Sequence, residues 1–161
     1  MKQLTALVRT AALSLALTAF AAHAITSNPA TPEDAKALAE QAAVHIKKVG
    51  FDQAMKDFTT DQSTWGLTTR DKLVYLYVYD YKGKVLAHAA NPAVVGKDLL
   101  GIKDPDGKTP VADSVKKAQE GGGFVEFKWS SPATKKIARG TAYILPVPGK
   151  DAYIGGHAFL E

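Results

Sequence analysis

One strand with two different faces places the strongest constraint on how this chain folds. Residues 73–79 alternate in character, and Val74, Leu76 and Val78 share one side. The other side carries Leu73 and three phenols, Tyr75, Tyr77 and Tyr79. Successive side chains of a strand point to opposite faces of a sheet, so one face is aliphatic and the other aromatic. The aliphatic face has to be covered by another element, whereas buried phenols require hydrogen-bond partners.

The flanking segments supply elements that complete such a sheet. Residues 31–50 begin with a Thr-Pro cap, end on glycine and carry apolar residues every three or four positions, which predicts a long helix. The other predicted elements are a short helix over 52–58, a loop over 91–108, a helix starting at Thr109, and strands over 85–89, 124–129, 136–145 and 152–160. We therefore predict an α+β fold, a five-stranded antiparallel sheet with the long N-terminal helix on one face and a loop-helix segment over the other.

The aromatic face is the candidate functional feature. Trp129 and Tyr143 fall on two later strands, and Arg139 has the same strand parity as Tyr143. An aromatic wall with a few polar tips and one cation is typical of a small-molecule pocket. The alternative is a solvent-exposed face on which tyrosine is favoured by its strand propensity. The pattern does not decide between the two interpretations.

The N-terminus has the three parts of a secretory signal peptide. A basic start precedes an apolar run over residues 11–22, and an Ala-x-Ala cleavage pattern ends at Ala24. The apolar run is shorter than the ~20 residues that span a bilayer, which disfavours the alternative of an uncleaved anchor. The mature protein is expected to be periplasmic or secreted, without stable membrane insertion. The predicted organisation is a signal peptide over 1–24, cleaved after Ala24, a flexible leader over 25–30, and one domain over 31–161.

Composition and motifs disfavour several function classes. The formal net charge is only +4 and no basic block is present, so nucleic-acid binding gains no support. The chain has no Cys, which removes thiol nucleophiles, thiolate metal sites and disulfides. Its histidines are far apart in sequence, and the Asp-Pro-Asp-Gly turn at 104–107 lacks the ligand spacing of a calcium loop. We expect neither catalysis nor a bound metal or cofactor.

Three stretches of the chain resemble a known family. The first is VYLYVYD with GKVLAH at residues 74–88, the second is NP, VGKDL and KDPDGK at 91–108, and the third is VEFKW, SPAT, a tyrosine and VPG at 125–149. In this order they resemble the single Cache domain of type 2, the extracellular sensing module of bacterial chemoreceptors and histidine kinases. The resemblance implies a PAS-like fold in which a long helix covers one sheet face. Central loops would roof a pocket on the other face, for small carboxylates, amino acids or related metabolites.

The resemblance also implies a set of pocket residues. The positions carried over are Tyr75, Tyr77, Tyr79, Trp129 and Tyr143, together with His88, whose strand parity depends on the preceding turn. The chain departs from the family pattern in three places. Ala89 follows His88 in place of proline, Gly140 and Thr141 stand where a lysine is common, and Gly155-Gly156-His157 replaces a Gly-x-Gly. These departures affect the identity of the ligand more than the fold, and Arg139 is the expected substitute for the missing lysine.

Together these observations predict an exported ligand-binding domain that senses a small molecule and signals through a partner protein. Arg139 would hold a carboxylate by charge-assisted hydrogen bonds, with tyrosine hydroxyls beside it and Trp129 on the apolar part. The alternative is a ligand-free interaction protein that docks onto a membrane-bound sensor through an exposed aromatic patch. An enzyme would instead need His88 or His157 beside an acid in a cleft.

Overall fold

The computed structural model describes residues 30–67, 73–131 and 134–160. The predicted signal peptide and all of the predicted leader except Ala30 lie outside these residues. The helices are α1 (Pro32–Val49), α2 (Phe51–Thr60), α3 (Gln62–Trp65), the 3-10 helix η2 (Pro92–Val94) and α4 (Pro110–Gln119). The strands are β1 (Val74–Asp80), β2 (Val85–His88), β3 (Gly123–Ser130), β4 (Ile137–Pro146) and β5 (Ala152–Phe159).

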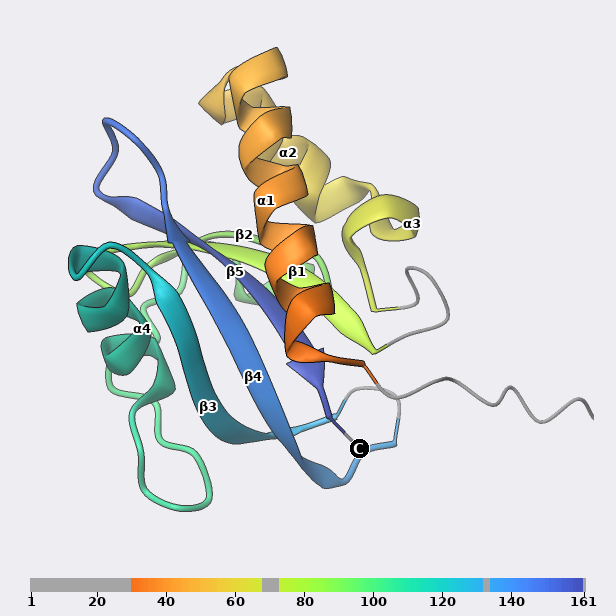
Figure 1. Ribbon diagram of the computed structural model, residues 1–161, viewed down its shortest axis with the longest axis vertical. Coiled ribbons are helices and arrows are strands. Elements are labelled where there is room, and N and C mark those ends of the chain that lie inside the picture. Colours follow the sequence, from red (N-terminus) through yellow and green to blue (C-terminus); the bar gives the residue numbers. More distant parts are fainter. Residues whose placement is uncertain (1–29, 68–72, 132–133, 161) are drawn as a thin grey trace, which may run out of the picture.

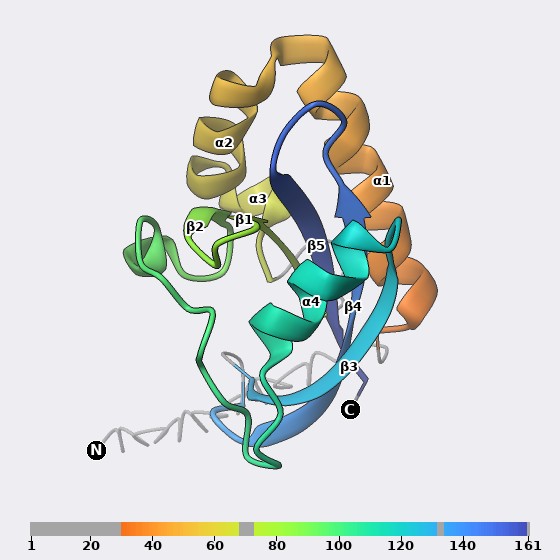
Figure 2. The ribbon, with the colours of Figure 1, turned by 90° about the vertical axis from the view of Figure 1, so that its left-hand side faces the viewer.

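The five strands form one antiparallel sheet in the order β2-β1-β5-β4-β3. The C-terminal strand β5 therefore lies in the middle, between β1 and β4. Helix α1 crosses one face of the sheet (Figure 1), and α4 lies against the other (Figure 2). This arrangement confirms the predicted α+β fold. Within the described ranges, no helix combines the length and the apolar character needed to cross a bilayer.

Helix α1 is set by a capping box and a stripe of small residues. The hydroxyl of Thr31 accepts the amide N–H of Asp34 at 3.2 Å, and the Asp34 carboxylate accepts the amide N–H of Thr31 at 2.8 Å. The buried stripe consists of Ala35, Leu38, Ala39 and Ala42. It packs on the predicted aliphatic side of β1. The contact is close enough that a Cβ on Gly156 of β5 would overlap the carbonyl oxygen of Ala35.

Helices α2 and α3 extend this layer beyond the predicted short helix over 52–58. The boundary between them is Asp61, whose carboxylate caps α3 by accepting the amide N–H of Thr64 at 3.1 Å. Phe58 and Trp65 pack edge to face, with ring centroids 4.8 Å apart. The layer over the aliphatic face is thus a continuous apolar core.

A bulge in β2 decides where its last residue points. Tyr79 pairs with Val85 and Val78 pairs with Ala87, so Leu86 is an extra residue with no partner on β1. The shift brings His88 opposite Tyr77 and therefore onto the tyrosine face. Without the bulge, the alternation of the strand would place His88 under α1.

The loop before α4 is fastened to β3 by one buried carboxylate. Asp104 accepts the amide N–H groups of Asp106 and Lys108 at 2.9 Å each, and that of Lys128 on β3 at 3.2 Å. Partial desolvation raises the pKa of Asp104, but these hydrogen bonds outweigh it and hold the pKa below its usual value. The turn that superficially resembles a calcium loop thus uses its carboxylate to fix the chain that leads into α4.

Candidate functional site

A cavity of about 420 Å³ lies on the sheet face opposite α1. Its floor is the tyrosine side of β1 with Tyr153 of β5, and the rest of its lining comes from α4, β3, Lys135 after β3, and the end of β2 with the segment that follows it. The lining residues are Tyr75, Tyr77, Tyr79, His88, Ala90, Asn91, Val94, Leu99, Ile102, Pro110, Val111, Ser114, Phe127, Trp129, Ser130, Lys135 and Tyr153. The three tyrosines of β1 are at most 6% exposed, so the alternative of a solvent-exposed aromatic face does not hold.

The tyrosines of the floor are neutral hydrogen-bonding groups. Burial is the main cause that raises the pKa of Tyr75, Tyr77 and Tyr79, and the proximity of one phenol to the next adds to it for the first two. Their rings follow one another along β1, with centroids 6.1 Å and 5.0 Å apart. Each hydroxyl therefore keeps its proton and is available to donate it in a hydrogen bond.

His88 has a defined tautomer. Its Nδ1 accepts the backbone N–H of Asn91 at 3.0 Å, so the proton of the neutral ring is on Nε2. Burial lowers the pKa of His88 to about 4, which keeps the ring neutral near pH 7. The imidazole stacks on Tyr75 with centroids 5.2 Å apart. His88 thus supplies one oriented N–H donor beside the phenols.

Two residues of β5 belong to the same face although the sequence analysis did not select them for the pocket. Tyr153 lines the cavity, and its hydroxyl lies near that of Ser114 but makes no hydrogen bond of good geometry with the described residues. His157 is fully buried, and within the same ranges neither of its ring nitrogens has a partner. Burial lowers the pKa of His157 to about 3, with a further contribution from His88. Tyr153 and His157 are four residues apart on one strand, so their side chains point to the same face of the sheet. This even spacing is the sequence signal that could have placed Tyr153 beside His157.

His157 occupies a space that a glycine leaves open. Its ring lies 4.9 Å from those of Tyr75 and Phe127 and 4.5 Å from that of Phe159, centroid to centroid. A Cβ on Gly140 of β4 would come within 2.6 Å of the imidazole Nε2. The two departures noted in the sequence, glycine at 140 and histidine at 157, are therefore neighbours in space and fit one another.

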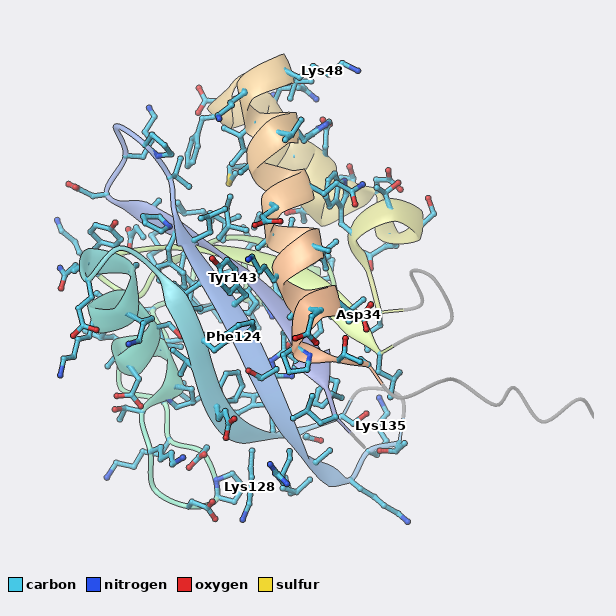
Figure 3. All side chains as sticks on the ribbon, viewed as in Figure 1. Asp34, Lys48, Phe124, Lys128, Lys135 and Tyr143 are labelled. Carbon is cyan, nitrogen blue, oxygen red and sulfur yellow. The ribbon has the colours of Figure 1, made fainter. Side chains whose placement is uncertain are left out.

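The structure does not bring Arg139 and Tyr143 to the cavity, which corrects the expectation that both line it. Tyr143 packs on the α1 side of the sheet, where Lys36 lies 5.6 Å from its ring centroid and the Phe124 ring lies at 4.9 Å (Figure 3). Arg139 shares that side and is exposed. The reason is register, because Trp129 pairs with Ala138 while Arg139 pairs with Lys128. Adjacent positions of β4 face opposite ways, so Trp129 reaches the cavity and Arg139 does not.

The charged residue that does line the cavity is Lys135, in the turn between β3 and β4. Its position at the end of the sheet is visible in Figure 3. No acidic side chain is among the lining residues of the described chain. In the same ranges, no group of three His, Asp or Glu gathers into a potential metal site. The cavity is therefore a space with aromatic and aliphatic walls, several neutral donors and one cation.

Comparison with protein families and curated proteins places the chain among sensory proteins. The model of the single Cache domain 2 family matches residues 2–161. The sensor histidine kinase MctS of Rhizobium johnstonii is 30% identical over 87 residues, and the methyl-accepting chemotaxis protein McpP of Pseudomonas putida is 34% identical over 71 residues. These alignments cover 54% and 44% of this chain but only 19% and 13% of the relatives. The chain thus spans a minor part of the length of both relatives.

Solved structures with the same architecture are also sensor domains. A methyl-accepting chemotaxis protein from Vibrio parahaemolyticus has a TM-score of 0.64 at 21% identity, over 80% of this chain and 88% of that one. A Cache chemosensory domain described for its carboxylic acid recognition has a TM-score of 0.64 at 19% identity, over 80% and 92% of the two chains. At such identities the likeness establishes the fold, and it agrees with the predicted Cache architecture.

Proposed function

The chain belongs to the single Cache domain 2 family, and we propose that it is an exported sensor that recognises a small carboxylate and passes the signal through a partner protein. Cache domains sense ligands in chemoreceptors and histidine kinases, and the family is non-catalytic. Beyond membership of this family, the proposal specifies the chemical class of the ligand and the export of the chain. It rests mainly on one observation, a cavity whose polar lining is rich in hydrogen-bond donors and contains no acid in the described chain.

The donor-rich lining favours a ligand that only accepts hydrogen bonds. The neutral phenols and the Nε2–H of His88 can all donate, and the indole of Trp129 has a donor and no acceptor. An ionised carboxylate is an acceptor-only group, and its hydrogen bonds are stronger than neutral ones. Val94, Leu99 and Val111 supply apolar surface for a short carbon chain. One solved Cache domain of the same fold is described for carboxylic acid recognition, which is in keeping with this assignment.

The proposed ligand-binding residues are those of the predicted set that face the cavity, together with one addition. They are Tyr75, Tyr77, Tyr79, His88, Trp129 and Tyr153. Tyr153 joins the set because its buried hydroxyl, although near Ser114, makes no hydrogen bond of good geometry with the described residues, and such a hydroxyl is costly unless a ligand or water completes it. Amino acids remain a second ligand class of the proposal, because their carboxylates present the same acceptor atoms.

The proposed setting is the periplasm. The signal-peptide pattern over residues 1–24 supports export. One structural neighbour is a periplasmic sensor domain of a chemotaxis protein, with a TM-score of 0.61. The curated relatives are a histidine kinase and a chemoreceptor. A membrane-bound sensor of that kind is therefore the proposed partner.

The proposal is tested by measuring the melting temperature of the protein from Ile25 onward, freed of ligand, against a panel of organic acids and amino acids. A ligand at 100 times its dissociation constant stabilises the native state by about 2.7 kcal/mol. This corresponds to a shift of several degrees in a domain of this size. A selective shift with carboxylates is expected.

A matched pair of variants locates the binding. Tyr77→Phe removes a phenol hydroxyl from the cavity, whereas Tyr143→Phe removes one from the α1 side of the same sheet. The first variant should reduce the ligand-induced shift and the second should leave it unchanged. No shift with any compound would reject the ligand-binding proposal and redirect the search to a protein partner.

A further inference from the structure

The cavity contains one unmatched charge. Among its lining residues in the described chain, Lys135 alone carries a full charge near neutral pH. The tyrosines and His88 are neutral there, for the reasons given above, and the remaining lining residues are uncharged. Some lysines of the described chain are paired, as Lys128 with Asp106 at 3.0 Å and Lys117 with Glu120 at 3.1 Å, and others, such as Lys136, are not. Within the described ranges, Lys135 has no such partner.

The backbone at Lys135 is unusual for its residue type. Its φ is 58°, and it is the one non-glycine residue of the described chain with a positive φ. The left-handed region favours glycine or asparagine, because a longer side chain is strained there. A strained residue next to a cavity is a reason to ask what its side chain does, since local strain tends to persist at binding sites.

The turn holds Lys135 in place from both sides. The amide N–H of Lys135 donates to the carbonyl of Ser131 at 2.8 Å, and the amide N–H of Ser131 donates to the carbonyl of Lys136 at 2.8 Å. Ser131 itself is fully buried, although it lies in a hairpin turn. These bonds attach Lys135 firmly to the ends of β3 and β4, where Trp129 and Ser130 also line the cavity.

We propose that Lys135 is the anion-recognition residue of the cavity and orients the ligand so that its carboxylate lies beside the end of β3. This inference rests on the proposed function and assigns to Lys135 the part first expected of Arg139. A charge-assisted hydrogen bond from the ammonium group is stronger than the neutral hydrogen bonds that the phenols and the imidazole can donate.

The test uses two neighbouring lysines and two kinds of probe. Lys135→Asn removes the charge but suits a left-handed backbone, and Lys135→Gly also relieves the strain, so both should fold. Lys136→Asn is the matched control, because Lys136 is adjacent and, like Lys135, exposed, but does not line the cavity. The probes are the straight-chain monocarboxylates from acetate to hexanoate and the corresponding primary amides, with affinities measured by calorimetry.

The wild type should bind the best monocarboxylate at least tenfold more tightly than its amide. Both Lys135 variants should lose that tenfold preference while their affinity for the amide stays the same, and Lys136→Asn should behave as wild type. Undiminished acid binding by the Lys135 variants overturns the inference but leaves the cavity as a carboxylate site. Equal binding of acid and amide by the wild type also overturns it. Absence of binding to any probe overturns both the inference and the carboxylate function.

Discussion

The two faces of the sheet are built on opposite principles. The α1 face is covered by Ala35, Leu38 and Ala39, packed on aliphatic residues of β1 and β5. The other face carries aromatic rings, a cavity of about 420 Å³, and polar atoms of Tyr153 and His157 that lack partners in the described chain. Close packing gives stability, whereas cavities and unpaired polar groups reduce it. The comparison indicates that the α1 face stabilises the domain, whereas the cavity face carries the destabilising features that the proposed binding site would explain.

The largest difference between the two faces is expected at acid pH, where protonation of two buried histidines should destabilise the cavity face. His88 and His157 have pKa values of about 4 and about 3 in the folded protein, against about 6.5 in the unfolded chain. Between these values the unfolded state binds more protons, so the free energy of unfolding is greatest above pH 6.5 and falls as the pH drops. The expected loss by pH 4 is about 3 kcal/mol for each ring.

Urea unfolding between pH 7.5 and pH 4 measures this loss. His157→Leu should remove about half of the loss and leave the part that comes from His88. His45→Gln should remove none of it, because His45 pairs with Asp57 on the helices over the α1 face, with Nε2 2.7 Å from the carboxylate. A profile that stays as steep in His157→Leu as in the wild type would show that the acid sensitivity does not come from the buried imidazole.

Gly155 and Gly156 are adjacent on β5 and face opposite sides of the sheet, so a substitution at each position compares the two faces directly. A Cβ on Gly156 would overlap the carbonyl oxygen of Ala35, which belongs to the backbone of α1 and not to the end of a flexible side chain. A Cβ on Gly155 would instead overlap the ring of Tyr77, which borders the cavity and can rotate into it. Gly156→Ala should therefore lower the free energy of unfolding by about 3 kcal/mol, and Gly155→Ala by about 1 kcal/mol.

The measurement is urea unfolding combined with ligand binding. Gly155→Ala should weaken binding more than its effect on stability, because the displaced ring fills the cavity. Equal destabilisation by both substitutions would contradict the view that only the cavity face has room to adjust.

Removal of the buried imidazole should increase stability by a smaller amount. His157→Leu replaces a ring with two unpaired nitrogens by an apolar side chain in an aromatic surrounding. At pH 7.5 the free energy of unfolding should rise by about 1 kcal/mol, since an unsatisfied buried polar group carries a penalty of that order. Thermal or urea unfolding checks it, and a clear loss of stability would imply that a water or ligand pairs with His157.

The smallest effect is expected for Arg139→Ala. Arg139 is exposed and lies on the α1 side of β4, away from the cavity. Its removal should change the free energy of unfolding by less than about 0.5 kcal/mol and leave ligand affinity unchanged. Calorimetry on Arg139→Ala, with Lys135→Asn measured in parallel, tests this expectation. A loss of carboxylate binding in Arg139→Ala would return the anion-binding role to Arg139.

The sequence by itself determined the elements and the character of each face. Alternation in residues 73–79 predicted the two-faced strand, and the capped, periodic segment from Thr31 to Gly50 predicted α1. Both signals are local, because strand and helix periodicity follow from backbone geometry. The shared face of Tyr75, Tyr77 and Tyr79 could therefore be recognised from residue order alone, whereas the pattern left open whether that face lines a cavity.

Only the tertiary structure decided how the strands register with one another. A bulge at Leu86 turned His88 toward the cavity, and the pairing of Trp129 with Ala138 turned Arg139 away from it. The contact of Gly140 with His157 and the approach of Lys135 to the cavity likewise depend on residues distant in sequence. A shift of one residue in register reverses every side chain of a strand. For this reason the sequence could identify the aromatic face but not the cation that completes it.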